Sequence, residues 1–327
     1  MKILVTGGAG YIGSIVVEEL LNQKHSVVVI DNLQEGHREA VLPGATFFEG
    51  DFGDAVLLRD IFSRHRIDAV LHFAAETTIE FSMTDPSKYF RNNVTKGITL
   101  LDVMLKYNCN RFIFSSTAAT FGEPKYTPID ETHPQEPINA YGESKLMFEK
   151  VLDWYHRAYG VKFNAFRYFN AAGASERLGE AHRHETHLIP LIIQVALGQK
   201  EKLQIFGKDY PTRDGTCIRD YIHVVDLAEA HILALENLET RPAAKYNLGN
   251  GEGFSNLEVL RMVEKVSGKK INWDFAARRP GDPAVLIASS ELAQKELGWE
   301  PKFADLESIV TSAWEWHKRY PEGYGTS

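Results

Sequence analysis

Apolar and polar positions follow two alternating spacings along the first half of the chain. Short continuous apolar runs, typical of strands buried on both faces, are followed by segments with apolar residues three and four positions apart, typical of helices. The pattern predicts strands at residues 3–5, 26–30, 46–49, 69–75, 111–116 and 163–169, and helices at 15–21, 55–63, 93–106 and 138–159. Because strands and helices alternate in chain order, we predict an α/β fold with a Rossmann-type, doubly wound parallel sheet.

The second half of the chain changes character after residue 169. Polar loops separate short periodic segments there, and strong strand and helix signals return at residues 220–235. We therefore place a boundary near Asn170, with a dinucleotide-binding domain at residues 1–170 and a smaller, interleaved substrate-binding lobe at 171–327. The part near residues 220–250 is predicted to return to the first domain. Ligands should lie between the lobes, outside the carboxyl ends of the parallel strands.

A glycine-rich turn separates the first predicted strand from the first predicted helix. Residues 6–13 read Thr-Gly-Gly-Ala-Gly-Tyr-Ile-Gly, which contains both G-x-G-x-x-G and G-x-x-G-x-x-G. Glycines at such a junction let the N–H groups of a helix N-terminus approach a pyrophosphate. Asp31 follows the second strand, where an acid accepts a ribose 2′-OH and repels a 2′-phosphate. We therefore expect NAD, in preference to NADP, as the cofactor.

Charge and cysteine content narrow the choice of partners. The 327 residues carry a formal net charge of −8, which gives no electrostatic footprint for nucleic acid or an anionic membrane. Only two cysteines occur, which argues against a disulfide scaffold and favours a reducing compartment. No stretch is apolar enough for a membrane span. We expect a cytoplasmic protein with a small-molecule partner, and neither nucleic acid nor membrane.

A tyrosine and a lysine lie four residues apart near the start of the longest predicted helix. Tyr141 and Lys145 therefore share one helix face. A tyrosine titrates near pH ~10, but an adjacent cation and a positively charged nicotinamide ring both favour the phenolate, so we predict Tyr141 to act as a base near neutral pH. Thr117 is expected to steady the reacting hydroxyl. The alternative is a Tyr–Lys pair that simply lines a helix surface.

These motifs resemble the extended short-chain dehydrogenase/reductase family. Longer segments at residues 207–223, Arg167-Tyr-Phe-Asn170 and 278–282 resemble, within it, the UDP-glucose 4-epimerase family, over nearly the whole chain. The resemblance implies an isomerase that reversibly inverts C4 of UDP-glucose or UDP-galactose through a 4-keto sugar, with NAD as cofactor. It also implies a homodimer built on the helices near residues 93–106 and 138–159.

The resemblance assigns roles to individual residues. Tyr141, Lys145 and Thr117 would be catalytic. Contacts to NAD are implied for Gly7, Gly10, Tyr11, Ile12, Gly13, Asp31, Asn32, Asp51, Phe52, Phe73, Ala74, Ala75, Asn93, Ser115, Tyr141, Lys145 and Tyr168. Contacts to the UDP-sugar are implied for Thr117, Tyr141, Asn170, His187, Leu188, Gln204, Phe206, Arg219, Arg279, Asp282 and Leu286. The acid and ring at Asp51 and Phe52 equally suit an ordinary helix cap followed by a buried side chain.

Some positions leave alternatives open. An epimerase for another UDP-sugar, such as a UDP-N-acetylhexosamine, a UDP-uronate or a UDP-pentose, depends on the size of the pocket at Leu286. A nucleotide-sugar dehydratase needs acids beside Thr117, where this chain has Ala118 and Ala119. A non-catalytic NAD-binding sensor would not need the tyrosine and lysine. Three histidines at 182, 184 and 187, with Glu185, suggest a metal site, but they lack cysteine partners and catalytic ligand spacing, so we expect none.

Overall fold

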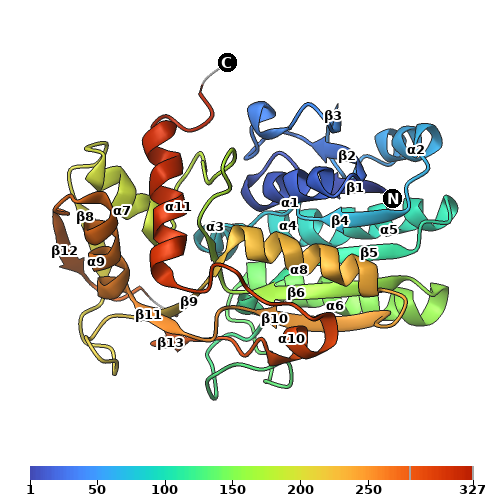
Figure 1. The fold of residues 1–327 in the computed structure, drawn as a ribbon. Helices are drawn as coiled ribbons and strands as arrows, with labels where there is room; N and C mark the ends of the chain where they lie inside the picture. The colour runs from blue at the N-terminus through green and yellow to red at the C-terminus, as the bar shows by residue number, and fades with distance from the viewer. Residues whose placement is uncertain (280, 326–327) are drawn as a thin grey trace.

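A seven-stranded parallel sheet forms the centre of the larger part of the molecule (Figure 1). The computed structural model describes residues 1–279 and 281–325, so Pro280, inside the predicted segment 278–282, lies outside the described residues. The strand order is β10-β6-β5-β4-β1-β2-β3. The bounds are β1 (Lys2–Thr6), β2 (Ser26–Asp31), β3 (Thr46–Glu49), β4 (Ala69–His72), β5 (Arg111–Thr117), β6 (Lys162–Tyr168) and β10 (Ala243–Leu248). The predicted doubly wound α/β fold is confirmed.

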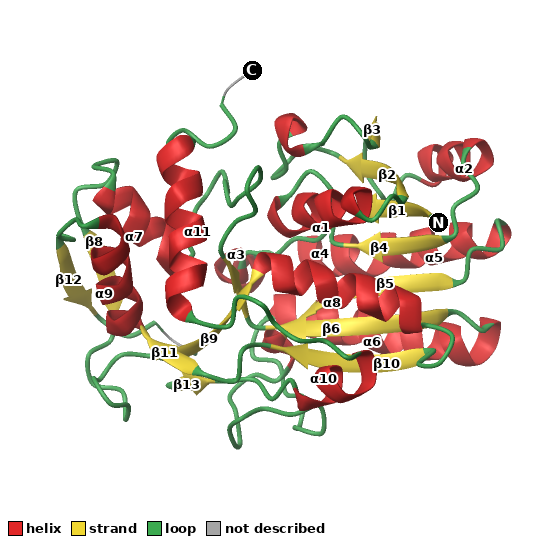
Figure 2. Cartoon of the chain, viewed as in Figure 1, coloured by secondary structure: helices red, strands yellow, loops and turns green. Residues whose placement is uncertain are grey.

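Helices cover both faces of this sheet (Figure 2). On one face lie α1 (Tyr11–Asn22) and α8 (Val224–Asn237), and on the other lie α2 (Ala55–Arg64), α5 (Lys96–Lys106) and α6 (Ala140–Tyr159). Strand β1 explains the arrangement, because Ile3 and Val5 pack with α1 and α8 while Leu4 packs with α2, α5 and α6. Burial on both faces is why the strands read as continuous apolar runs.

The strand order reverses between β1 and β4. Chain segments leave the carboxyl ends of these two neighbouring strands toward opposite sides of the sheet, which opens a crevice at that edge. The glycine loop after β1 and the segment after β4 therefore meet there. The fold places the predicted dinucleotide motif at the position where open α/β sheets bind their ligands.

The smaller part of the molecule contains two further sheets and three helices. Strands β7 (Asn170–Ala172), β9 (Ile218–His223), β11 (Gly253–Ser255) and β13 (Val285–Leu286) form one sheet, and β8 (Leu203–Phe206) pairs with β12 (Trp273–Ala276). The helices are α7 (Leu188–Ala196), α9 (Asn256–Ser267) and α11 (Leu306–Arg319). They pack around their own apolar cluster, which includes Ile192, Val259 and Ile309.

The chain passes between the two parts more than once. Strand β9 of the smaller part runs directly into α8, which packs on α1, and β10 then pairs with β6 before the chain returns to β11. Later, α10 (Glu291–Leu297) packs against α8 and β10. Residues 224–248 and 291–297 therefore lie with the large sheet, although the division into domains at residue 170 stays a prediction.

Element bounds differ from the sequence prediction mainly at helix starts. Helix α1 begins at Tyr11, four residues before the predicted start, because the glycine loop already curves into the helix. The predicted helix at 93–106 begins with a π-turn, η2 (Arg91–Thr95). Short elements such as η1 (Arg38–Ala40), α3 (Ile79–Thr84), α4 (Pro86–Phe90) and η3 (Ala118–Thr120) were not predicted, because they are too short to produce a periodic pattern. Within the described part of the chain, every helix is too short or too polar to cross a bilayer.

Candidate functional site

The loop between β1 and α1 is shaped by glycines that no other residue can replace without strain. Gly7 has φ 72°, and a Cβ there would lie 2.5 Å from the backbone nitrogen of Ala74. A Cβ on Gly13 would lie 2.2 Å from the carbonyl oxygen of Gly7. Within the described structure, no side chain caps the N-terminus of α1 and its first turn holds no acid. The N–H groups and the helix dipole there remain available to an anion.

Asp31 ends β2 beside this loop. Its Oδ2 accepts a hydrogen bond from the backbone N–H of Ala9 at 3.0 Å, and its Oδ1 accepts one from Leu33 at 2.9 Å. Burial raises the pKa of the Asp31 carboxyl, and these two hydrogen bonds oppose that rise. Each oxygen keeps a lone pair for a ribose hydroxyl. Asn32 is exposed and accepts a hydrogen bond from Gln34.

The glycine cradle and the carboxylate together fit a dinucleotide. Ile12 and Gly13 lie in the first turn of α1 next to Tyr11, whose hydroxyl donates to the carbonyl of Gly173 at 2.7 Å. The segment after β4 forms the opposite wall. There Ala74 donates to the Thr6 carbonyl at 3.1 Å, and the ring of Phe73 packs against that of His231. Ala75 follows and is half-buried.

Asp51 and Phe52, the expected adenine contacts, already have partners in the protein. Asp51 pairs with Lys96 and accepts a hydrogen bond from the Gly53 N–H at 2.7 Å. The Phe52 ring is buried with its centroid 4.9 Å from that of His72. The residue that caps α2 is Asp54, so the alternative reading of Asp51 as a helix cap is wrong. The adenine contact itself stays a prediction.

Asn93 uses its amide to join three segments of the protein. Its Oδ1 accepts from the Glu76 N–H at 2.9 Å, and its Nδ2 donates to the Glu76 carbonyl and to Ser144 Oγ, both at 3.0 Å. Asn93 is 2% exposed. The side chain therefore holds the segment after β4 against α6, and its expected contact with NAD stays a prediction.

The three predicted catalytic residues come from the end of β5 and the first turns of α6. Asn139 caps α6 by accepting from the Gly142 N–H at 2.8 Å, and a Cβ on Gly142 would lie 2.4 Å from the Ala119 carbonyl oxygen. That glycine lets the helix start approach the turn that follows Thr117. Lys145 is 2% exposed and donates to the Ser115 carbonyl at 2.8 Å, with its Nζ 5.9 Å from the centre of the Tyr141 ring.

Burial away from water is the main cause of the pKa shifts of Tyr141 and Lys145. Burial raises the pKa of Tyr141 to about 12, and a hydrogen bond with the Thr117 side chain acts in the opposite direction. Burial lowers the pKa of Lys145 to about 7, and the negative charge of Glu149 opposes it. The prediction that Lys145 and the nicotinamide charge together make Tyr141 a base near neutral pH concerns the protein with its cofactor bound, and it stays a prediction.

Ser115 and Tyr168 complete the edge next to Lys145. They lie on the paired strands β5 and β6, where Thr117 is in register with Tyr168. The Ser115 and Tyr168 hydroxyls share a hydrogen bond, and burial raises the pKa of Tyr168. This pair positions the carbonyl of Ser115 that receives the Lys145 ammonium group.

The residues expected to bind the sugar nucleotide lie in the smaller part of the molecule. They occupy β7 (Asn170), the start of α7 (His187 and Leu188), β8 (Gln204 and Phe206), β9 (Arg219), the segment before β13 (Arg279 and Asp282) and β13 (Leu286). Strand β9 brings several together, because Arg219 is in register with Leu286 and neighbouring Tyr221 is in register with Asn170. The Asn170 amide donates to the Asp220 carbonyl at 2.8 Å.

Both arginines of this group have partners inside the protein. The Arg219 guanidinium is 12% exposed and pairs with Asp282, and it also donates to the Ile218 carbonyl at 2.8 Å. The Arg279 guanidinium carbon lies 3.9 Å from the centre of the Phe206 ring. The ion pair with Asp282 holds the guanidinium group of Arg219 in place, and stacking on Phe206 holds that of Arg279. Planar guanidinium groups in fixed positions favour recognition of oxyanions.

The two parts of the molecule meet beside Thr117. Leu286 of β13 and Ala118, which follows Thr117, both pack against one small apolar cluster. The cluster contains Phe121, Ile129, Phe169 and Ala288. Leu286 therefore lies where the predicted sugar-binding strand meets the predicted catalytic strand.

Comparisons with known proteins identify the family of this chain. The sequence profile of the NAD dependent epimerase/dehydratase family matches residues 3–249. The chain belongs to this family. A curated UDP-glucose 4-epimerase from Lacticaseibacillus casei is 53% identical over 328 residues, which cover 99% of each chain. The predicted family resemblance is confirmed.

Solved structures of relatives have the same fold over the full length. One crystal structure of a UDP-glucose 4-epimerase has a TM-score of 0.97 and 50% identity, and the match covers 100% of both chains. The UDP-glucose 4-epimerase from Brucella ovis, crystallised in complex with NAD, has a TM-score of 0.93 and 44% identity, with 96% of this chain and 97% of that chain covered.

In this member of the epimerase/dehydratase family, sequence reasoning missed the polar contacts next to Lys145, the predicted catalytic lysine. Glu149, one helical turn beyond Lys145, receives a forked ion pair from Arg167 of β6, with Nε–Oε1 3.0 Å and Nη2–Oε2 2.6 Å. Ser116 also donates to Glu149. The side chains of Arg167 and Glu149 are 3% and 1% exposed. The spacing of four from Lys145 to Glu149 was the available signal, but the arginine is distant in the sequence.

Proposed function

We propose that this chain catalyses the reversible inversion of C4 in UDP-glucose and UDP-galactose, with NAD as its cofactor. One observation carries the proposal: Tyr141, buried Lys145 and Thr117 converge at the carboxyl end of β5, beside a glycine loop built for a dinucleotide. The chain also matches curated UDP-glucose 4-epimerases over its whole length. The enzyme is an isomerase.

The cofactor is held by the larger part of the molecule. The N–H groups at the start of α1 bind the pyrophosphate, and Asp31 binds the adenosine ribose. Ser115, Tyr168 and the segment 73–75, near the carboxyl ends of β5, β6 and β4, would hold the rest of the cofactor. When bound, NAD⁺ supplies the acceptor, and later the donor, of the hydride at C4 and also a positive charge.

Tyr141 moves the proton in this reaction. Its phenolate oxygen accepts the O4 proton as C4 becomes a ketone, and the same hydroxyl returns a proton to O4 when C4 is reduced on its other face. Lys145 stabilises the phenolate by its charge, although its own lowered pKa of about 7 leaves it only partly protonated at neutral pH. Thr117 hydrogen-bonds with Tyr141 and orients O4. The cofactor charge supplies the remaining stabilisation that burial of the phenol demands.

The smaller part of the molecule anchors the nucleotide while the sugar turns. Arg219 and Arg279 bind the diphosphate through their planar donor pairs, and Phe206, Gln204, Asn170, His187, Leu188 and Asp282 contact the rest of the UDP group. An anchored diphosphate lets the 4-keto sugar rotate and present its opposite face. The apolar residues Ala118 and Leu286 beside Thr117 provide no acid for a dehydratase reaction.

We also propose that the enzyme acts as a cytoplasmic homodimer. Helix α6 exposes Met147, Trp154 and Tyr159 at 39%, 65% and 61%, beside α5. Large apolar side chains on neighbouring helices suit a helix-to-helix interface between two copies. The two cysteines are free and buried, which fits a reducing compartment.

The test is a direct assay of the purified protein with UDP-galactose, followed by measurement of UDP-glucose. Tyr141→Phe removes the proton acceptor and keeps the ring, so kcat should fall by roughly 10²-fold or more. Tyr155→Phe is the matched control, because its hydroxyl lies on the same helix but donates to Asp102 at 2.6 Å. A Tyr141→Phe enzyme with near-normal kcat would place the proton transfer on another group.

A further inference from the structure

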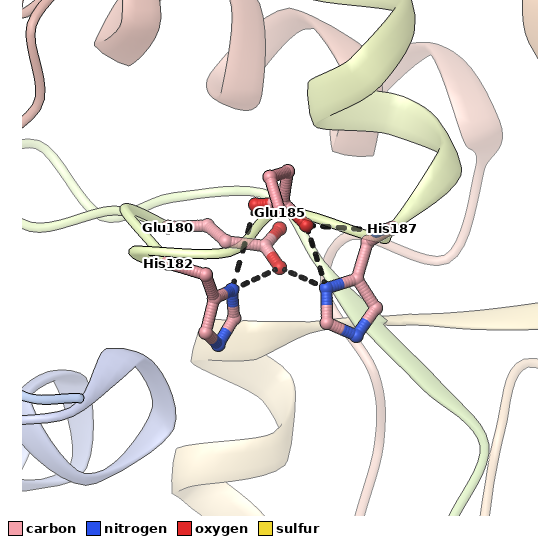
Figure 3. Close-up of side chains that lie close together, drawn as sticks. All are labelled: Glu180, His182, Glu185 and His187. Carbon is pink, nitrogen blue, oxygen red and sulfur yellow. Dashed lines mark hydrogen bonds and ion pairs between the residues drawn. The ribbon is translucent and has the colours of Figure 1, made fainter. Parts of the chain in front are cut away.

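Two glutamates and two histidines converge in the segment that leads into α7. In Figure 3 the carboxylates of Glu180 and Glu185 and the imidazoles of His182 and His187 point toward one another. One ligand atom from each residue lies within 4.8 Å of all the others. Glu180 Oε1 is 3.1 Å from His182 Nδ1 and 2.8 Å from His187 Nδ1. Glu185 Oε2 is 3.5 Å from His182 Nδ1, and its Oε1 is 2.9 Å from His187 Nδ1.

The two carboxylates are buried side by side. Their side chains are only 5% and 7% exposed for Glu180 and Glu185. One oxygen of each carboxylate lies within 4.8 Å of the other. Two negative charges this close in a site of low dielectric constant repel each other strongly unless positive charge lies between them. The site needs about two positive charges to be neutral.

Among the described residues, two buried polar atoms of the cluster have no aligned hydrogen-bond partner. Glu180 Oε1 is inaccessible to solvent and has no aligned hydrogen-bond donor, although two imidazole nitrogens are within 3.1 Å. His182 Nδ1 is likewise buried and without an aligned partner. An imidazole nitrogen carries at most one proton, so it cannot point a donor at two carboxylate oxygens at once. A cation at the centre would instead bind all four atoms.

We infer that Glu180, His182, Glu185 and His187 form a structural Zn²⁺ site. Tetrahedral coordination with bond lengths of about 2.0–2.1 Å places neighbouring ligand atoms about 3.3 Å apart. Glu180 Oε1 lies 3.1 and 2.8 Å from the two imidazole nitrogens, and Glu185 approaches the same nitrogens through its two different oxygens at 3.5 and 2.9 Å. One ligand atom from each residue lies within 4.8 Å of all the others, so a small shift of the Glu185 carboxylate would complete the tetrahedron. Two nitrogens and two oxygens favour a transition metal over Ca²⁺ and Mg²⁺, which prefer more oxygen ligands. Four protein ligands leave no open position, as in structural sites.

This inference reverses the expectation of no metal that was drawn from the sequence. That expectation weighed the three histidines with Glu185 and did not include Glu180, which is the most buried member of the cluster. His184 is not a ligand, since its ring stacks on Phe81 with the centroids 6.0 Å apart. The ligand pattern is therefore E-x-H-x-x-E-x-H, and the fold, not the spacing, brings its members together.

The site ties the smaller part of the molecule to the cofactor side. Within the same segment, the Ala181 carbonyl lies 2.6 Å from His37 Nε2, and Arg183 reaches the carbonyls of Leu33 and Gly36 at 3.4 Å. These partners follow Asp31 in the chain. A bound metal would fix residues 180–187 against the loop of residues 33–37, which follows Asp31. His187, 52% exposed, offers the metal a path from solvent.

The test measures metal binding on the full-length protein and needs no catalytic turnover, so its outcome is separate from that of the proposed epimerase activity. Protein stripped with a chelator is titrated with Zn²⁺ in competition with a chromophoric chelator. We expect about one equivalent per chain at sub-micromolar affinity and a higher Tm with metal. His182→Ala and Glu180→Gln should each weaken binding by roughly 10²-fold, while His184→Ala, in the same segment, should not.

Co²⁺ provides a second measurement on the unaltered protein, so the result does not depend on whether a variant folds. A tetrahedral site gives Co²⁺ an intense visible absorption, and Zn²⁺ should displace it at one equivalent. Far-UV circular dichroism checks the fold of each variant. Binding to several weak sites, a weak octahedral Co²⁺ spectrum, or equal affinity in His182→Ala and His184→Ala would each overturn the inference.

Discussion

At the scale of single residues, burial shifts the pKa values of Tyr141 and Lys145 in opposite directions, and each shift favours the neutral form of the side chain. The pKa of Tyr141 rises to about 12 and that of Lys145 falls to about 7. Burial disfavours both the phenolate of Tyr141 and the ammonium of Lys145. The phenolate that the proposed reaction requires therefore depends on the positive charge of the bound cofactor. In the proposed mechanism, ionisation of Tyr141 is therefore coupled to binding of the cofactor.

The lowered pKa of Lys145 predicts a pH-dependent contribution to stability in nucleotide-free protein. Below about pH 7 the lysine is protonated in both folded and unfolded states, and the cost of its buried charge is fully present. Between about pH 7 and the ordinary lysine pKa near 10.4, the unfolded chain binds more protons than the folded protein does. The free energy of unfolding therefore rises with pH in this range.

Urea unfolding at about pH 6.5 and about pH 9 measures this effect. Wild type should gain stability relative to Lys145→Met as the pH rises. Lys150→Met, at an exposed position on the same helix, should keep a constant difference from wild type. Parallel pH profiles for wild type and Lys145→Met would contradict the prediction.

Leu286 is predicted to limit the group at C2 of the sugar. Leu286→Ala should raise kcat/KM for UDP-N-acetylglucosamine relative to UDP-glucose, by an amount on the order of 1–3 kcal/mol for the space of a few methylenes. The matched control is Ile287→Ala, because Ile287 faces the other way, toward Gly253 of β11. Were Leu286 only a core residue, its truncation would cost about 2–5 kcal/mol of stability and leave the substrate ratio unchanged.

At the scale of elements, a buried polar network fixes α6, the helix of the proposed catalytic pair, to the sheet. Asn93 joins the segment after β4 to α6, and Glu149 joins α6 to β5 and β6 through Ser116 and Arg167. Arg167 also lies over the Phe121 ring of the cluster beside Thr117, at 5.3 Å. The orientation of the first turns of α6 therefore depends on contacts made two turns further along.

Breaking this network from one side should be costly. Glu149→Leu leaves the Arg167 guanidinium buried without its carboxylate, and the free energy of unfolding should fall by about 3–5 kcal/mol. The double variant Glu149→Leu/Arg167→Met replaces both charges by apolar groups and should recover most of that loss. Denaturant unfolding of the two variants makes the comparison. A double variant no more stable than Glu149→Leu would show that the ion pair itself, and not an orphaned charge, sets the cost.

How much of the structure the sequence predicts depends on the length and burial of each element. Six strands of the large sheet were predictable from their apolar runs, most of which are buried on both faces, whereas β10, half of whose residues are exposed or only partly buried, was not predicted as a strand. Local spacing was enough to single out Gly7, Gly13 and Asp31. Strands such as β7 and β13 are too short to produce a pattern. Glu149 pairs with Arg167 from a different element, and Glu180 meets His182 and His187 only because of the path of the loop between them. These contacts can be seen only in the folded structure.

At the scale of the whole molecule, the exposed aromatic side chains of α6 point to assembly. Trp154→Glu places a charge in the proposed interface and should shift the protein from twice the mass of one chain to a single chain, measured by light scattering after size exclusion. Phe275→Glu, at a 36% exposed aromatic on β12, is the control and should leave the mass unchanged. Equal masses for wild type and Trp154→Glu would remove α6 from the interface.

The position of β10 at the edge of the large sheet has a consequence for synthesis on the ribosome. Strand β6 hydrogen-bonds with β10, and α1 packs on α8, yet β10 and α8 come some sixty to eighty residues after β6 in the chain. While those residues are still being translated, at about 5–20 residues per second, the nascent sheet carries an open edge and an uncovered face for several seconds. The nascent chain is therefore most exposed to aggregation, and most in need of chaperones, after β6 has emerged and before residue 248 has left the exit tunnel.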